Sequence, residues 1–234
     1  AMKAALSTHD FDGKSLHVKA QASPGLIGKD LVKEVTCQKP YYWSESGDYT
    51  VIVLDCGVKW SILRQLARRN CRVLVMPAQT KAADMLGEKP DGIVLSNGPG
   101  DPAGVPYVVE EVKKFLGKVP VFGICFGQQI LGLALGGKTY KLKFGHHGGN
   151  QPVRDRASGV IAITAQNHGF CVDLDSLAKD ELKITHMNLN DNTLEGIRHK
   201  KLPLFSVQFH PEAGPGPNDA RYLFDHFVTM MKKA

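Results

Sequence analysis

Disulfide and metal-binding cysteine patterns are absent from this sequence. Its 234 residues include five cysteines, and no two of them are spaced as C-x-x-C. An odd number without paired spacing argues against a disulfide scaffold or a zinc ribbon and fits a reducing compartment. We therefore expect a cytoplasmic protein in which most cysteines are small buried hydrophobic residues.

Long hydrophobic runs are also missing. The most apolar stretch, residues 119–137, is interrupted by Gln128 and Gln129, and the first residues form no apolar leader. A helix needs about 20 consecutive apolar residues to span a bilayer, so we expect no membrane association. Ala1 precedes Met2, which suggests a piece cut from a longer protein.

Clusters of one charge sign are equally scarce. The 29 Lys and Arg residues exceed the 23 Asp and Glu residues by 6, but they are scattered and not interleaved with aromatic residues. We interpret them as solvated surface and predict no nucleic-acid binding. With 43% hydrophobic residues, the composition is that of a globular protein.

The chain divides into two regions by pattern. Residues 1–48 contain a short helix predicted over 28–35 and a polar linker at 44–48, and they cannot bury a core alone. From residue 49 apolar strands alternate with amphipathic helices. We predict strands over 49–54, 71–76, 92–95 and 119–124, and helices over 60–69, 81–86, 107–116 and 126–135. This alternation is typical of an α/β fold with a doubly wound, mostly parallel sheet flanked by helices.

The C-terminal half, after residue 137, is rich in strands. We predict strands over 139–144, 160–165, 183–188, 193–198 and 205–209, and a closing helix over 218–231. Ligands of such sheets bind at the carboxyl ends of the parallel strands. The loops at 55–58, 96–102 and 125–128 should therefore meet there.

A candidate nucleophile lies in one of these loops. Residues 123–127 read GICFG between a predicted strand and a predicted helix. This is the cysteine counterpart of the G-x-S-x-G turn, in which small residues allow close backbone approach. The start of the following helix favours a thiolate at Cys125. Taken alone, a buried structural cysteine remains the alternative.

A base and an orienting acid follow at the end of the last predicted strand. His210 and Glu212 are two residues apart, so on an extended chain they face the same side. Glu212 can then hold one imidazole nitrogen while the other faces Cys125. The alternative is a solvent-exposed histidine at a strand end.

The loop after the third strand can supply an oxyanion site. Residues 96–100 read SNGPG and can present a backbone N–H group. The N–H of Phe126, next to the nucleophile, would be a second donor. Such a pair stabilises the transition state of acyl transfer by about 3–4 kcal/mol per donor. The alternative is an ordinary turn between a strand and a helix.

No metal site is expected. His146 and His147 are adjacent, and the sequence shows no third ligand near them. Two neighbouring histidines alone are a weak indication of a metal.

These motifs, in this order, resemble the class I, triad-type glutamine amidotransferases. The likeness is greatest to the glutamine-hydrolysing small subunits of carbamoyl-phosphate synthases, and it runs from about residue 21 to the C-terminus. It is carried by residues 23–26 (SPGL), 95–102 (LSNGPGDP), 122–125 (FGIC), 138–146 (KTYKLKFGH), 166–170 (QNHGF) and 208–212 (QFHPE).

The resemblance implies a flavodoxin-like fold and a glutaminase. Cys125, His210 and Glu212 match the catalytic triad. Gly98 and Phe126 match the oxyanion positions. The positions that hold glutamine are matched by Gln129, Asn167, Gly169 and Phe170. Residues 1–48 would be the remnant of an N-terminal domain plus a linker, and residues 49–234 the amidotransferase domain.

The resemblance also implies a partner. Ammonia would pass to a large synthase subunit, or to a fused synthase domain, that makes carbamoyl phosphate for pyrimidine and arginine synthesis. ATP and magnesium would bind that partner, and this chain would carry no cofactor. Two alternatives remain: a non-catalytic docking module that regulates a synthase, or another cysteine hydrolase of the same fold.

Overall fold

Apolar strands and amphipathic helices alternate from residue 49 to residue 134, as the sequence predicts. The computed structural model describes residues 3–232. Its first four parallel strands are β2 (Tyr49–Asp55), β3 (Cys71–Pro77), β4 (Gly92–Leu95) and β5 (Val121–Ile124). The helices between and after them are α3 (Trp60–Ala67), α4 (Ala82–Gly87), α5 (Pro106–Phe115) and α6 (Phe126–Ala134). None of the helices in residues 3–232 is both long and apolar enough to cross a membrane.

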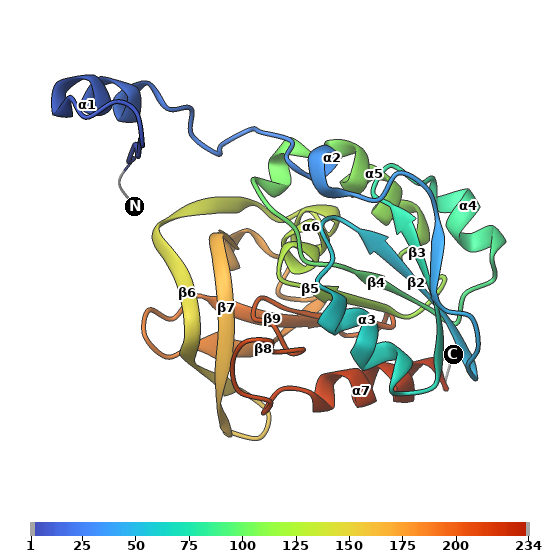
Figure 1. The fold of residues 1–234 in the computed structure, drawn as a ribbon. Helices are drawn as coiled ribbons and strands as arrows, with labels where there is room; N and C mark the ends of the chain where they lie inside the picture. Colours follow the sequence, from blue (N-terminus) through green and yellow to red (C-terminus); the bar gives the residue numbers. More distant parts are fainter. Residues whose placement is uncertain (1–2, 233–234) are drawn as a thin grey trace.

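One sheet of ten strands runs through the molecule (Figure 1). Its order is β1-β3-β2-β4-β5-β10-β9-β8-β6-β7. The strands from β3 to β10 (Leu204–Val207) are parallel, whereas β1 (Tyr41–Ser44) is antiparallel to β3. The other half is antiparallel and contains β6 (Thr139–Asp155), β7 (Ile161–Val172), β8 (Leu182–Asn188) and β9 (Leu194–His199). The α/β prediction is confirmed, including its strand-rich C-terminal half.

Helices cover both faces of the parallel half. Successive side chains of a strand point to opposite faces, and β2 shows the result. Ile52 and Leu54 pack in the core cluster that includes residues of α4, α5 and α6. Val51 and Val53 pack instead with α3 and with α7 (Tyr222–Met231). The carboxyl ends of the parallel strands therefore stay open, and only loops shape a site there.

Four features depart from the sequence prediction. Strands β6 and β7 are 17 and 12 residues long, because the glycines and polar residues after position 144 continue pairing across the β6–β7 hairpin. Helix α1 (Gly13–Ala22) is not indicated by the sequence pattern; it has no buried residues and lies apart from the sheet (Figure 1). The predicted helix at 28–35 is limited to α2 (Val32–Val35). Strand β1 adds part of residues 1–48 to the sheet.

Phe122 is the centre of the core on the α3 and α7 face. It is fully buried, stacks on Phe205 with a centroid distance of 4.3 Å, and meets Phe224 edge-on at 5.6 Å. We expect Phe122→Ala to lower the free energy of unfolding by about 3–5 kcal/mol, because it removes these contacts and leaves a cavity.

Urea unfolding measures this effect, and Phe11→Ala is the matched control because Phe11 is 84% exposed. The control should change stability by less than about 0.5 kcal/mol. Equal losses in the two variants would contradict the placement of the core.

Candidate active site

Cys125 lies on a strained turn between β5 and α6. Its φ is 55° and its ψ is −102°, a conformation that a non-glycine residue keeps only when its surroundings enforce it. The Cys125 N–H donates to the carbonyl of Val207 on β10 at 2.8 Å. A Cβ at Gly123 would lie 2.7 Å from the Leu131 side chain, and one at Gly127 would overlap the Leu95 carbonyl. The two glycines thus permit the close packing that the sequence motif predicts.

His210 and Glu212 follow β10, the neighbour of β5 in the sheet. The His210 N–H donates to the Ala165 carbonyl at 2.8 Å, which fixes the backbone. The Nδ1 atom of His210 lies 2.8 Å from Glu212 Oε1, and His210 lines the same cavity as Cys125. The structure therefore brings together the three residues that the sequence nominates as a triad.

Charge interactions within the triad oppose the effect of burial on the pKa values of His210 and Glu212. Burial alone would lower the pKa of His210, but the negative charges of Cys125 and Glu212, and the hydrogen bonds to both, raise it above its ordinary value. Burial would raise the pKa of Glu212, yet the charges of His210 and Lys59 lower it. The arrangement thus favours an imidazolium at His210 and a carboxylate at Glu212.

Lys59 is a site residue that the sequence did not indicate. Its Nζ lies 2.8 Å from Glu212 Oε1 and donates to the Ala213 carbonyl at 2.8 Å. Its backbone N–H donates to Asn97 Oδ1 at 2.9 Å. Lys59 lies 153 positions before Glu212 in a loop without a motif, so only the fold reveals the contact.

Two hydrogen bonds hold the loop after β4 against the loop after β2. Ser96 Oγ accepts from the Cys56 N–H at 2.9 Å, and the Asn97 side chain donates to the Gly57 carbonyl at 2.9 Å. A Cβ at Gly98 would overlap the Cys56 carbonyl, so a larger residue does not fit. Gly98 lines the same cavity as Cys125, and Phe126 opens α6, where the first N–H groups have no partner within the helix. Both predicted donors therefore lie beside the sulfur.

Two adjoining cavities meet at Cys125. One of about 570 Å³ is lined by Cys125, His210, Lys59 and Gly98, among others. The second, of about 300 Å³, contains all four residues that the resemblance assigns to glutamine. These are Gln129, Asn167, Gly169 and Phe170. The structure thus brings the predicted substrate residues to one side of the nucleophile and the imidazole to the other.

Hydrogen bonds fix the walls of the smaller cavity. Gln129 Nε2 donates to the Phe170 carbonyl at 2.8 Å and to Gln208 Oε1 at 3.1 Å. Its amide oxygen is then the group that Gln129 can offer a ligand. Lys141 lines the same cavity, with its Nζ 5.7 Å from the centre of the Phe170 ring. This cation is a second feature that the sequence did not single out.

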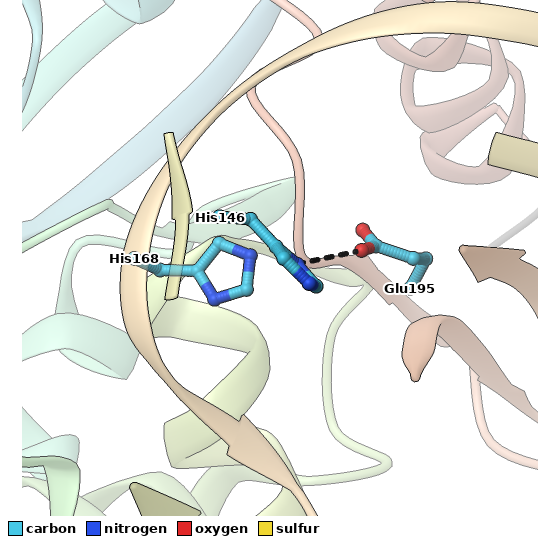
Figure 2. Close-up of side chains that lie close together, drawn as sticks. All are labelled: His146, His168 and Glu195. Atoms are coloured by element: carbon cyan, nitrogen blue, oxygen red, sulfur yellow. Dashed lines mark ion pairs between the residues drawn. The ribbon is translucent and has the colours of Figure 1, made fainter. Parts of the chain in front are cut away.

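One cluster of potential metal ligands adjoins this cavity, and its member His168 lines the cavity wall. His146 and His168 are opposite each other on β6 and β7, and Glu195 of β9 lies beside them (Figure 2). The sequence shows no third ligand near His146 because His168 and Glu195 lie 22 and 49 positions after it in the chain. Burial lowers the pKa of His168 to about 3, so its ring is neutral at pH 7.

The other four cysteines differ from Cys125 in their surroundings. Burial raises the pKa of Cys37 and Cys171 to about 12 and that of Cys71 to about 11, and it also raises the pKa of Cys56. All five cysteines are free thiols. Among the five, Cys125 alone lines a cavity together with the His210 ring in the part of the chain that the structure describes.

The comparisons with known proteins match the part of the chain that contains Cys125, His210 and Glu212. Residues 52–230 match the family model described as glutamine amidotransferase class-I. The chain is 52% identical over 242 residues to a carbamoyl phosphate synthase small chain of Syntrophotalea carbinolica, covering 97% of this chain and 64% of the relative. It is also 52% identical to the small chain of Salmonella typhi, covering 94% and 62%. This chain therefore spans a little less than two thirds of these relatives.

Two further comparisons concern a plant relative and a solved structure. A chloroplastic carbamoyl phosphate synthase small chain of rice is 49% identical, with 88% of this chain and 49% of the relative covered. A crystal structure from Thermoplasma acidophilum, assigned to a GMP synthase, has a TM-score of 0.69 at 22% identity. The match covers 79% of this chain and 94% of that one, and at this identity it supports the fold alone.

The geometry predicts how the alkylation rate of Cys125 depends on pH. Burial would lower the pKa of His210, but its anionic neighbours raise it, so the ring stays positive above its ordinary value of about 6.5. A positively charged ring then lines the cavity of the nucleophilic sulfur at pH 7. We expect His210→Gln to slow alkylation of Cys125 by iodoacetamide at pH 7 by about tenfold or more, with a smaller difference at pH 9.

His186→Gln is the control, because His186 is also buried but lies on β8. It should leave the alkylation rate unchanged. Equal rates in wild type and His210→Gln at pH 7 would show that the ring does not act on the sulfur.

Proposed function

Because this chain belongs to the class-I glutamine amidotransferase family, we propose that it hydrolyses the side-chain amide of glutamine for a carbamoyl-phosphate synthase. The observation that carries the proposal is the triad of Cys125, His210 and Glu212, with Cys125 on an elbow beside two cavities. The small-chain relatives at about half identity support the choice of synthase. These relatives are longer than this chain, so the activity of the whole protein is part of the proposal.

The first half of the reaction transfers the glutaminyl acyl group to sulfur. The Cys125 thiolate attacks the amide carbon, and the carbonyl oxygen takes the negative charge. The N–H groups of Gly98 and Phe126 stabilise this oxyanion. His210 then gives its proton to the amide nitrogen, the C–N bond breaks, and ammonia leaves a thioester on Cys125.

The second half releases glutamate. His210, now neutral, takes a proton from water, and the hydroxide attacks the thioester carbon. The C–S bond breaks and the thiolate returns, so that one water is consumed for each glutamine. Glu212 keeps the ring oriented throughout, and Lys59 keeps Glu212 ionised and in place.

The smaller cavity suits the other end of glutamine. An amino acid carries an ammonium and a carboxylate, which need an acceptor and a cation, respectively. The Gln129 oxygen can accept from the ammonium, and Lys141 supplies positive charge for the carboxylate. Asn167, Gly169 and Phe170 complete the walls.

Ammonia from this site would feed a large, ATP-using synthase subunit or fused domain. Free ammonia is mostly protonated at neutral pH and then loses its lone pair, so direct transfer to the partner is favoured. ATP and magnesium serve the partner's reaction, whereas the triad needs no cofactor for hydrolysis. We place the protein in a reducing compartment such as the cytosol, consistent with its five free thiols.

Covalent labelling tests the nucleophile. A glutamine analogue with an electrophilic carbon, such as 6-diazo-5-oxonorleucine, should modify Cys125 in a one-to-one ratio and abolish glutamate release. Cys125→Ser should lose both labelling and hydrolysis. Cys37→Ser is the control, since Cys37 is the most exposed cysteine, and it should retain both.

Assays with and without the large synthase partner distinguish a slow isolated domain from an inactive one. Labelling at another cysteine, or none with the large partner present, would contradict the proposal.

Substitution of Lys59 tests whether this residue positions the Glu212 carboxylate. Lys59→Met removes the cation on Glu212, so the carboxylate loses both charge compensation and a fixed position. We expect kcat for glutamine hydrolysis to fall about tenfold or more with KM little changed, because Lys59 lines the imidazole side and not the glutamine cavity.

Lys59→Arg should restore part of kcat, and Lys118→Met, at an exposed lysine, should have no effect. An unchanged kcat in Lys59→Met would remove Lys59 from the account.

A further inference from the structure

The buried group of His146, His168 and Glu195 is not used by the hydrolysis reaction. The three residues are 7%, 6% and 0% exposed, and one potential ligand atom from each lies within 4.8 Å of the other two. The two imidazole rings meet edge to face at 4.9 Å. Two imidazoles and a carboxylate are a donor set typical of zinc.

The distance between two of these donor atoms fits two ligands of one metal ion better than it fits a hydrogen bond. His146 Nδ1 lies 3.5 Å from Glu195 Oε1 (Figure 2), which is too long for a good hydrogen bond. Two ligands of a tetrahedral zinc ion lie about 3.4 Å apart when each is about 2.1 Å from the metal. His146 Nδ1 and Glu195 Oε2 are also buried without a hydrogen-bond partner among the described residues. Such orphaned atoms are costly unless something pairs with them.

Hydrogen bonds hold the two imidazole rings on the sides away from the cluster, and one more holds the Glu195 oxygen that faces His146. His146 Nε2 lies 2.7 Å from Asp191 Oδ2, and His168 Nδ1 lies 2.8 Å from the Phe170 carbonyl. Asn188 Nδ2 donates to Glu195 Oε1 at 3.0 Å. An acceptor on the distant nitrogen of each ring fixes the tautomer and leaves the other nitrogen with a lone pair for a metal.

The surroundings of His168 Nε2 include one more oxygen atom. This Nε2 lies 3.0 Å from Gln166 Oε1, although the Nδ1 proton is already directed at Phe170. Gln166 cannot easily turn, because its Nε2 donates to Thr164 Oγ1 at 3.1 Å. That hydroxyl in turn donates to the Gln151 carbonyl at 2.9 Å. Gln166 Oε1 therefore lies beside His168 Nε2, where it can serve as a further ligand of the same cation.

We propose that His146 Nδ1, His168 Nε2 and Glu195 bind one Zn²⁺ ion, with the Gln166 oxygen or a water as the fourth ligand. Imidazole ligands favour zinc over magnesium or calcium. Asp191, whose side chain is 41% exposed, provides a polar route from the surface. The ion would join β6, β7 and β9 behind the strand that carries Asn167 and Phe170. Its role is structural, because His146 and Glu195 line neither cavity at Cys125 and His168 lines only the smaller one.

Zinc content tests the site directly. The experiment uses Cys125→Ser protein, since the Cys125 thiolate beside His210 could itself bind zinc. After dialysis against micromolar Zn²⁺ and then metal-free buffer, we expect one zinc per chain and a higher Tm. In the same background, His146→Gln and Glu195→Gln should retain less than a tenth of that zinc.

Two further variants make the test specific. Asp191→Asn should weaken zinc binding about 10–100-fold, because it removes the carboxylate behind His146. His186→Gln, a buried histidine outside the cluster, should bind zinc as well as its parent.

A spectroscopic measurement covers the case in which the variants do not fold. Co²⁺ added to the Cys125→Ser protein should give the intense visible bands of a tetrahedral site without a sulfur charge-transfer band. Three results would overturn the proposal: no zinc in the parent protein, equal zinc in His146→Gln, or a sulfur charge-transfer band. A metal-free parent would mean that a second proton on His146, shared with Asp191 and Glu195, occupies the site instead.

Discussion

The adjacent ends of two parallel strands determine how this protein can act. Ile124 of β5 pairs with Val207 of β10, so Cys125, directly after Ile124, and His210, three residues after Val207, leave the same edge of the sheet. The Cys125 N–H completes the register by donating to Val207. The strained backbone of Cys125 is tolerated because the sheet holds both of its flanks. The other residues of the site set the charge, the orientation or the surroundings of Cys125 and His210.

Charge compensation explains how such a contact survives burial. An imidazolium, a thiolate and a carboxylate are costly when taken out of water singly, but here they lie in a row that ends at Lys59. His210 is 7% exposed and Glu212 is 1% exposed, and Lys59 is the only one of the row with substantial access to water. The charges of His210, Glu212 and Lys59 therefore offset one another in a low-dielectric site, where such interactions are strong. The buried His146 ring and Glu195 carboxylate differ in this respect, because one polar atom of each has no hydrogen-bond partner among the described residues.

The sequence predicts the residues that carry local signatures and misses those that depend on distant neighbours. Cys125 is recognisable because glycines flank it between a strand and a helix, and His210 and Glu212 because their spacing puts them on one side of an extended chain. Lys59 and Lys141 have no such signature, since their partners are set by the order of strands in the sheet. Strand β6 is longer than its pattern predicts because its glycine-rich second half pairs only through the long β6–β7 hairpin. Residues 1–48 have the pattern of a separate segment, yet β1 belongs to the sheet.

The most direct test of the account is detection of the acyl intermediate. Enzyme mixed with glutamine, in the presence of the large synthase partner, is quenched in acid within the first turnovers and digested for mass spectrometry. The account predicts a glutamyl thioester on the peptide that contains Cys125, and its accumulation when water attack is slowed in Glu212→Gln. Release of glutamate at the normal rate while Cys125 stays unmodified at every time point would contradict it.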